Sequence, residues 1–210
     1  MSEICGELHK LFSGLEHFRF PFVDKKIPQN GVYVLFEKGE LGHEGHRIVR
    51  AGTHTGINQL PSRLKQHFIK ENKDRSIFRK NIGRALLNQT GDPYAKIWEY
   101  DTTTREDITK YGCLIDHDKQ KQIEKKVTTY IQESFAFCVF PMKKKEDRLF
   151  WEARIISTVS WCRDCKPSAD WLGNYSPKEK IRESGLWLVN ELYKEPLNQV
   201  ELDKLCQWAI

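Results

Sequence analysis

Two polar residues that lie four positions apart suggest chemistry on a phosphate group. Arg63 and His67 fall within the segment 59–70, which has the apolar spacing of an amphipathic helix, so both side chains project from one flank of it. Arginine binds phosphate through a fork of donors, and histidine moves protons near neutrality. The pair suits a site that holds and cleaves a phosphodiester, and an ordinary surface pair is the alternative. The apolar stripe of this helix is Leu60, Leu64 and Phe68.

A carboxylate stands where the helical pattern of residues 147–159 calls for an apolar side chain. The spacing places Glu152 on the apolar stripe of this helix. A carboxylate on a buried face must be ion-paired, protonated or bound to a cation, because burying it alone costs several kcal/mol. An oxygen ligand for Mg²⁺ is one such arrangement, and a structural pair with Arg or Lys is another. The stripe itself is formed by Leu149, Ile155, Ile156 and Val159.

Two short strands are predicted before the helix that carries Arg63 and His67. Asn30-Gly31 is a turn signal, and the apolar run 32–36 follows it. A Gly- and His-containing turn at 38–46 leads to a second run at 47–51, so the two runs predict an antiparallel hairpin. Side chains alternate between the two faces of a strand, and Tyr33 taken alone is interpreted as a core residue.

The rest of the chain alternates between helical and strand-like patterns. Few strands with helices packed against them predict an α+β domain. Residues 94–100 are compatible with a strand, and 162–177 is rich in loop formers. The other predicted elements are a helical pattern over 1–20, a basic helix near 76–87, a helix near 119–132, a central buried strand at 134–140, and one or two short helices in the tail.

Positive charge is concentrated in one segment. The chain has a net charge of +5, and the stretch 63–84 has eight basic and two acidic residues, so the other 188 residues sum to −1. This distribution suits a polyanion such as nucleic acid, and a solvated helical face is the alternative. The basic residues predicted to contact nucleic acid are Lys65, Lys70, Lys73, Arg75, Arg79, Lys80 and Arg84.

The six cysteines are scattered along a chain that is not a small secreted one, so reduced thiols are expected. Cys162 and Cys165 form a single CxxC pair without a second pair at suitable spacing, and neither a zinc site nor a redox role is predicted from it. No run approaches the roughly 20 apolar residues of a membrane span, and the first residues lack a secretory pattern. A cytoplasmic protein without a membrane partner is expected.

Taken together, the motifs resemble GIY-YIG nucleases over roughly residues 30–70 and 134–177. Gly31-Val32-Tyr33 is similar to the first motif of that family, and Arg50-Ala51-Gly52 stands in the place of the second, with Arg50 where the family has a tyrosine. Arg63 and His67 match the pair on the following helix. The metal-binding glutamate and the asparagine that follows it correspond to Glu152 in LFWEARII and Asn174 in WLGNYSP.

The resemblance implies a small antiparallel three-stranded sheet flanked by helices, within a single domain over residues 1–210. Its core would span about 28–70 and 134–177. The segment at about 71–133 would be a basic helical insertion, and about 178–210 a helical tail. The insertion is a candidate for the element that reads DNA.

The resemblance also implies phosphodiester hydrolysis in DNA, with Mg²⁺ or Mn²⁺ bound by Glu152. Tyr33 and His67 would orient or deprotonate the attacking water, and Arg63 and Arg50 would stabilise charge on the phosphoryl oxygens. Thr53 and His54 would line the same pocket. Cutting two strands would need a homodimer or paired binding. The alternatives are a catalytically impaired nucleic-acid-binding module, which Arg50 favours, and an RNA-processing nuclease with the same site.

Overall fold

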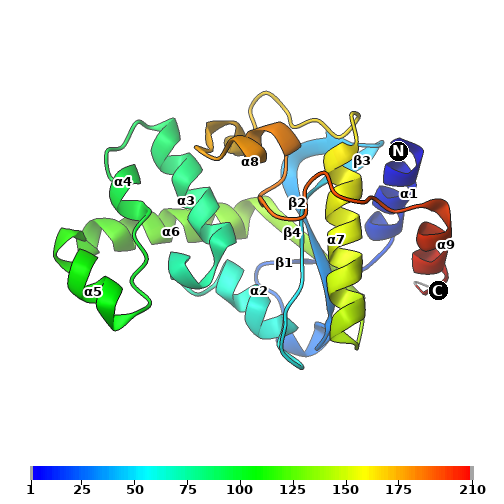
Figure 1. Cartoon of the computed structure of the whole chain (residues 1–210), viewed down its shortest axis with the longest axis horizontal. Coiled ribbons are helices and arrows are strands. Elements are labelled where there is room, and N and C mark those ends of the chain that lie inside the picture. Colours follow the sequence, from blue (N-terminus) through cyan, green and yellow to red (C-terminus); the bar gives the residue numbers. More distant parts are fainter. Residues whose placement is uncertain (1, 209–210) are drawn as a thin grey trace.

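The computed structural model describes residues 2–208 and arranges them as helices around a four-stranded antiparallel sheet (Figure 1). The strand order is β1-β4-β2-β3, in which β1 is His17–Arg19, β2 is Gly31–Gly42, β3 is Gly45–Gly52 and β4 is Phe135–Pro141. The α+β class is confirmed, but the sequence predicts three strands and the structure has a fourth. Strand β1 has only three residues, which is too short to show an alternating pattern, and its residues fall inside the predicted helical stretch 1–20.

The hairpin of β2 and β3 is longer than predicted and turns at His43 and Glu44, whose φ angles are 49° and 63°. Within it, Tyr33 lies opposite Gly52 and Leu35 lies opposite Arg50. The register then shifts between Leu35 and Phe36, which marks a bulge. Strand β4 pairs with both β1 and β2, so the predicted central position of this strand is confirmed.

One face of the sheet is covered by α1 (Ser2–Ser13), α7 (Lys145–Trp161) and α9 (Gln199–Trp208), which lie together on one side in Figure 1. Val32, Val34 and Phe36 of β2 point into this layer and pack with apolar residues of the three helices. The alternation predicted for β2 therefore holds for this face.

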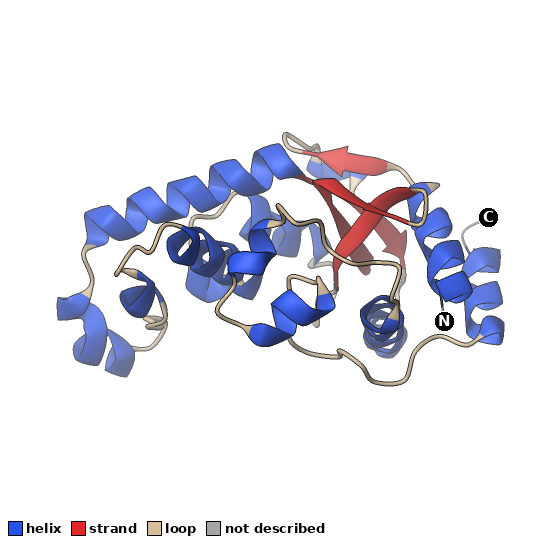
Figure 2. Cartoon of the chain, turned by 90° about the horizontal axis from the view of Figure 1, so that it is seen from above, coloured by secondary structure: helices blue, strands red, loops and turns tan. Residues whose placement is uncertain are grey.

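The opposite face of the sheet is covered by α2 (Leu60–Phe68), α3 (Ile77–Gln89) and α6 (His117–Ser134). Tyr33 and Leu35 of β2 point into this second layer. Helix α6 extends away from the sheet and, with α3, α4 (Ala95–Trp98) and α5 (Arg105–Tyr111), forms a helical lobe (Figure 2). Residues 94–100 contain the short helix α4 rather than the strand considered above, and the Asp92 side chain accepts the Tyr94 amide just before it.

The C-terminal part of the chain returns to the sheet. After α8 (Glu179–Ser184), the Trp187 amide donates to the carbonyl of Val49 on the outer strand β3, at 2.8 Å. The remaining short elements are the 3-10 helices η1 (Asp24–Lys26), η2 (Lys73–Arg75), η3 (Gly112–Leu114) and η4 (Leu172–Tyr175). In the range 2–208, no helix has the length and apolar character needed to cross a membrane.

Candidate active site

A hydrogen-bonded chain of three side chains joins β2 to α2 and α3. The Tyr33 hydroxyl lies 2.7 Å from Nε2 of His67, and Nδ1 of His67 lies 2.7 Å from Oγ of Ser76. Ser76 is the N-cap of α3 and accepts the Arg79 amide. Tyr33 and His67 are both fully buried. The sequence-predicted Tyr33 and His67 are thus in direct contact.

The His67 imidazole is neutral in this setting. Complete burial lowers its pKa well below the usual value, and the positive charges of Arg63, Arg50 and Arg79 lower it further. A neutral imidazole can both accept and donate a hydrogen bond, which matches its two hydroxyl partners. The neutral His67 can therefore accept a hydrogen bond from the Tyr33 phenol, while the same lowered pKa makes it a weak base.

The Tyr33 ring also lies directly against Gly52, its cross-strand partner. A Cβ atom added to Gly52 would lie 2.3 Å from the Tyr33 hydroxyl oxygen, which is far inside contact distance. Glycine at this position therefore permits the close approach of the phenol to the end of β3. The next residue along the chain is Thr53, where the other candidate side chains gather.

Glu152 reaches Thr53 from the opposite layer of helices. Its Oε1 accepts the Thr53 amide at 3.1 Å, while the Thr53 hydroxyl donates to the Gly31 carbonyl at 2.8 Å. The sequence predicts Glu152 on a buried stripe, and the structure places it half-buried at the edge of that stripe, because Leu149 is 40% exposed. The carboxylate consequently faces the end of β3 rather than the apolar core.

Arg50 also lies near the end of β3, and its side chain is on the same face of the sheet as that of Tyr33. It lines a cavity of about 260 Å³ together with Glu152. Its Nη1 donates to the Trp187 carbonyl and its guanidinium stacks 5.3 Å above the Phe78 ring. The Nε atom is buried without a partner among residues 2–208. An unpartnered donor on a buried cation is the feature expected of a group that awaits an anion.

Arg63 lines a second cavity, of about 340 Å³, with Thr53 and His54. Thr53 therefore borders the cavity of Arg63 on one side and binds Glu152 on the other. The charge of Arg63 also acts on Glu152, since both Arg50 and Arg63 oppose the rise in the pKa of that carboxyl group that burial causes. Arg63 itself donates to Gln66 and to the Arg75 carbonyl.

His54 adds a base to the cavity of Arg63. Its Nδ1 lies 2.8 Å from the Gly56 carbonyl, which makes Nδ1 the protonated nitrogen, while the buried Nε2 has no partner in the described part of the chain. Burial lowers the pKa of His54, and the nearby charge of Arg148 adds to this effect. The free lone pair on Nε2 can therefore accept a hydrogen bond at neutral pH.

Three residues near these cavities are missing from the sequence-based prediction. Arg148, one helical turn before Glu152, donates to the carbonyls of His54 and Gly56 and so fixes the loop after β3. Arg148 precedes Glu152 by four residues, and this helical spacing could have identified it from the sequence. Asn81 and Asn190 line the cavity of Arg50 and Glu152, and nothing in the sequence distinguishes them from other asparagines.

Asn174 lies apart from these groups. Its side-chain amide donates to the carbonyls of Ser168 and Ala169 in its own loop, and it lines neither the Arg50 cavity nor the Arg63 cavity. The structure therefore gathers Arg50, Arg63, Glu152, Thr53 and His54 around the end of β3, holds Tyr33 and His67 beneath it, and leaves Asn174 elsewhere.

Four of the seven basic residues predicted to contact nucleic acid are buried. Arg79 binds Glu124 of α6, the carbonyl of His67 and the hydroxyl of Thr128. The sequence predicts an exposed basic surface, and the structure corrects this, because acidic partners both inside the basic segment and outside it pair with much of its charge. The buried residues are Lys73, Arg79, Lys80 and Arg84, paired with Asp74, Glu124 or Glu99.

The remaining three basic residues of that set keep their charges near solvent. Lys70 and Arg75 are exposed, and Lys65 is partly exposed in an ion pair with Asp24. Arg75 adjoins the site directly, since its carbonyl accepts a hydrogen bond from Arg63. An electrostatic contact with a polyanion would rest on these residues and on Arg63.

The Glu152 carboxylate has the properties of a ligand for a hard divalent cation. Burial raises its pKa, and within residues 2–208 it forms no ion pair. A half-buried carboxylate with the Thr53 amide as its hydrogen-bond donor retains oxygen lone pairs that can bind Mg²⁺ or Mn²⁺. The residues present therefore fit such an ion.

Comparison with known protein families identifies the family to which this chain belongs. A family model described as the GIY-YIG domain matches residues 2–209, so the chain belongs to this family, as its motifs predict. The matched range includes the helical lobe as well as the sheet. No curated protein and no solved structure matches the chain. Membership of the family supports a nuclease-type function and, through it, a nucleic acid as substrate.

Proposed function

We propose that this protein is a metal-dependent endonuclease that hydrolyses phosphodiester bonds in DNA. The observation that supports the proposal most strongly is the meeting of Glu152 with the end of β3, where its carboxylate binds Thr53 between the cavities of Arg50 and Arg63. One acidic group beside two arginines is the combination that a phosphodiester site requires, because the substrate is anionic and gains charge in the transition state.

In this proposal Arg63 and Arg50 bind the phosphate that is cut. Arg63 would approach it from the cavity that it lines with Thr53 and His54, and Arg50 from the cavity that it lines with Glu152. Charge-assisted hydrogen bonds of this kind are about twice as strong as neutral ones, and they strengthen further as negative charge builds. Arg50 would then bind the phosphate at the position where other members of the family have the tyrosine of the second motif.

Glu152 would hold the divalent ion. When bound, Mg²⁺ or Mn²⁺ supplies Lewis-acid stabilisation of the phosphoryl oxygens and the leaving group. The carboxyl group must be ionised for this role, and its raised pKa means that metal binding weakens as the pH falls.

Tyr33 and His67 would orient or deprotonate the attacking water. The Tyr33 phenol is hydrogen-bonded to the neutral imidazole of His67, which holds its hydroxyl group in place. Both groups are buried without substrate, and catalytic contacts often form only in the complex. His54 is the second candidate base, since its free Nε2 already borders the cavity of Arg63.

A cleavage assay on plasmid, single-stranded, branched and RNA substrates, with Mg²⁺ and with Mn²⁺, tests the proposal. The wild-type protein should cut DNA, and Glu152→Ala should not. Glu146→Ala is the matched control, because Glu146 is an exposed glutamate on the same helix and should leave cutting unchanged. Cutting by Glu152→Ala would refute the site, and cutting of RNA alone would replace DNA as the substrate.

The competing hypothesis is a nucleic-acid-binding module that has lost catalysis. The observation that favours it is Arg50, which has a protein carbonyl as partner and occupies the place of a tyrosine. Binding to nucleic acid without cutting, on every substrate and with either metal, would establish that module. Sedimentation of the protein with and without duplex tests the homodimer that cutting both strands would need.

A further inference from the structure

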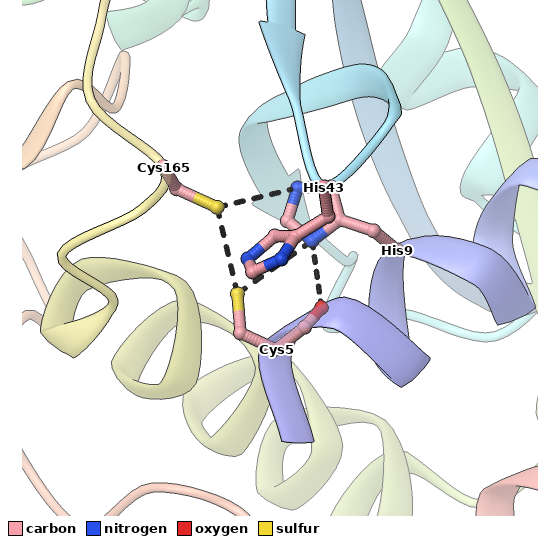
Figure 3. A group of neighbouring side chains, drawn as sticks. All are labelled: Cys5, His9, His43 and Cys165. Atoms are coloured by element: carbon pink, nitrogen blue, oxygen red, sulfur yellow. Dashed lines mark hydrogen bonds between the residues drawn. The ribbon is translucent and has the colours of Figure 1, made fainter. Parts of the chain in front are cut away.

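Four side chains that bind soft metals meet at the far end of the β2–β3 hairpin (Figure 3). Cys5 and His9 lie one turn apart on α1, His43 lies in the hairpin turn, and Cys165 lies in the loop after α7. Each offers one ligand atom, and these atoms all lie within 4.8 Å of one another. Cys5, His9 and Cys165 are buried, and His43 is half-buried.

The distances in this cluster match those of tetrahedral coordination. The two sulfur atoms lie 3.6 Å apart, and both cysteines are free. Nε2 of His9 lies 3.8 Å from the Cys165 sulfur, and Nδ1 on the other side of the same ring lies 3.6 Å from the Cys5 sulfur. Tetrahedral zinc with Zn–S bonds of about 2.3 Å holds two sulfur ligands about 3.8 Å apart. An ion would therefore fit with only small movements of the side chains.

We infer that Cys5, His9, His43 and Cys165 form a structural zinc site. Two sulfur and two nitrogen ligands in a tetrahedral arrangement favour Zn²⁺ over harder ions such as Mg²⁺. Two thiolates cancel the charge of the ion, so the complete site is neutral and suits a buried location. Four protein ligands close the coordination shell, which is the mark of a structural rather than a catalytic zinc.

His9 is held in the tautomer that a metal ligand needs. The Ile48 amide donates to Nε2 at 3.1 Å, so Nε2 carries the lone pair, and Nδ1 donates its proton to the Cys5 carbonyl at 2.8 Å. A backbone carbonyl that accepts the second N–H of a ligand histidine is the usual outer partner in zinc sites. Metal binding would direct the Nε2 lone pair to the ion, and the Ile48 amide would lose this acceptor.

The hairpin turn that carries His43 to the cluster has unusual residues at its two central positions. His43 and Glu44 both have positive φ, a conformation that such turns normally assign to asparagine and glycine. Strained backbone of this kind persists where the surroundings impose it, and it concentrates at binding sites. Gly6 of α1 lies beside the imidazole, since a Cβ there would lie 3.2 Å from its Nδ1.

Cys162 lies outside the set of four and contacts His43, whose Nε2 is 3.2 Å from its sulfur. Its sulfur could compete with His43 for the fourth position. A cavity of about 550 Å³, lined by His9 and His43, borders the cluster and gives an ion a path from solvent.

The site is separate from the proposed active site. Strand β3 runs from the hairpin turn to Thr53, which places the two sites on the order of 20 Å apart. The zinc would join α1, the hairpin and the loop after α7, which are far apart in sequence. Its role would be to fix the N-terminal helix, and the inference does not depend on nuclease activity.

Metal analysis of the purified full-length protein tests the inference. We expect one zinc per chain, with loss of at least 80% of it in Cys5→Ser and in Cys165→Ser. Cys113→Ser and Cys206→Ser, which alter cysteines outside the cluster, should keep it, and so should Glu152→Ala. Wild-type protein from zinc-supplemented cells that contains no zinc, or contains iron or copper instead, would overturn the inference.

Cobalt titration of the wild-type protein provides a first readout that does not depend on how well any variant folds. Wild-type protein stripped with a strong chelator and titrated with Co²⁺ should develop the visible bands of a tetrahedral thiolate complex, with one equivalent at the end point. The same titration of Cys162→Ser should be unchanged, while His43→Ala should weaken Co²⁺ binding at least tenfold. The absence of thiolate bands, or the reverse result for these two variants, would refute the ligand set.

Discussion

The Tyr33 phenol lies against the backbone of Gly52, its partner across the β2–β3 pair, and leaves no room for a side chain there. We expect Gly52→Ala to displace the ring, break its hydrogen bond with His67 and lower the free energy of unfolding by about 1–3 kcal/mol. Gly112→Ala is the control, since its Cβ would meet its nearest neighbour at an ordinary 3.7 Å. Denaturant unfolding measures both, and an equal loss in the two variants would contradict the prediction.

Removing the Tyr33 hydroxyl should affect stability and activity together. Tyr33→Phe leaves the buried Nε2 of His67 without its partner, which should cost about 1–3 kcal/mol of unfolding free energy. If Tyr33 activates the attacking water, cleavage should also fall by about 10²–10⁴-fold at saturating metal, measured under conditions where the variant is fully folded. A comparable fall in His54→Gln with normal cleavage by Tyr33→Phe would assign the base to His54.

The buried His67 should make the protein sensitive to acid. Its folded pKa lies below the usual value near 6.5, so at pH values below about 6.5 the unfolded chain binds a proton that the folded protein does not. Stability is then complete above pH 6.5 and decreases as the pH falls toward the folded pKa. His67→Gln should lack this component, so the stability difference between wild type and variant should shrink from pH 7 to pH 5. A constant difference would show that His67 does not titrate in this way.

The buried pair of Arg79 and Glu124 should be structural. Glu124→Ala leaves the Arg79 guanidinium uncompensated in the interior, and we expect a loss of about 3–5 kcal/mol of unfolding free energy. Arg75→Ala removes an exposed arginine near the same helix and should change stability by no more than about 0.5 kcal/mol. Similar stability of the two variants would mean that the pair is not buried in solution.

The exposed basic residues near Arg63 should carry the salt dependence of DNA binding. For duplex DNA, each phosphate contact contributes about 0.9 to the slope of log K against log salt, so Lys70→Gln and Arg75→Gln should each reduce the slope by up to that amount. Lys110→Gln, on α5 in the helical lobe, should not change it. A reduced slope for Lys110→Gln alone would move the DNA contact to that lobe.

The parts of the site that follow local periodicity could be predicted from the sequence. The spacing of Arg63 and His67 placed both on α2, and alternation along β2 separated Tyr33 from Val32 and Val34. Even so, the same helix turned His67 inward and left Arg63 at the surface, because Tyr33 and Ser76 provide His67 with buried partners. Which flank of a helix is buried depends on tertiary neighbours.

The features that could not be predicted depend on residues distant in sequence. The basic segment suggested an exposed face, but Arg79 finds its carboxylate 45 residues further on, at Glu124. The CxxC pair lacked a second half in the sequence, and the structure brings Cys5 and His9 to Cys165 across more than 150 residues. Cys5 and His9 have the same spacing of four as Arg63 and His67, but the sequence did not show which other ligands would lie beside them.

The return of Trp187 to β3 has a consequence for the boundaries of the folded unit. Its amide binds Val49 and its carbonyl receives Arg50, so this short segment closes the outer edge of the sheet and anchors the arginine at once. A fragment that stopped at residue 177, where the core suggested by the motifs ends, would expose an unprotected strand edge that can pair with other molecules. Self-association and a misplaced guanidinium would therefore arise from the same truncation.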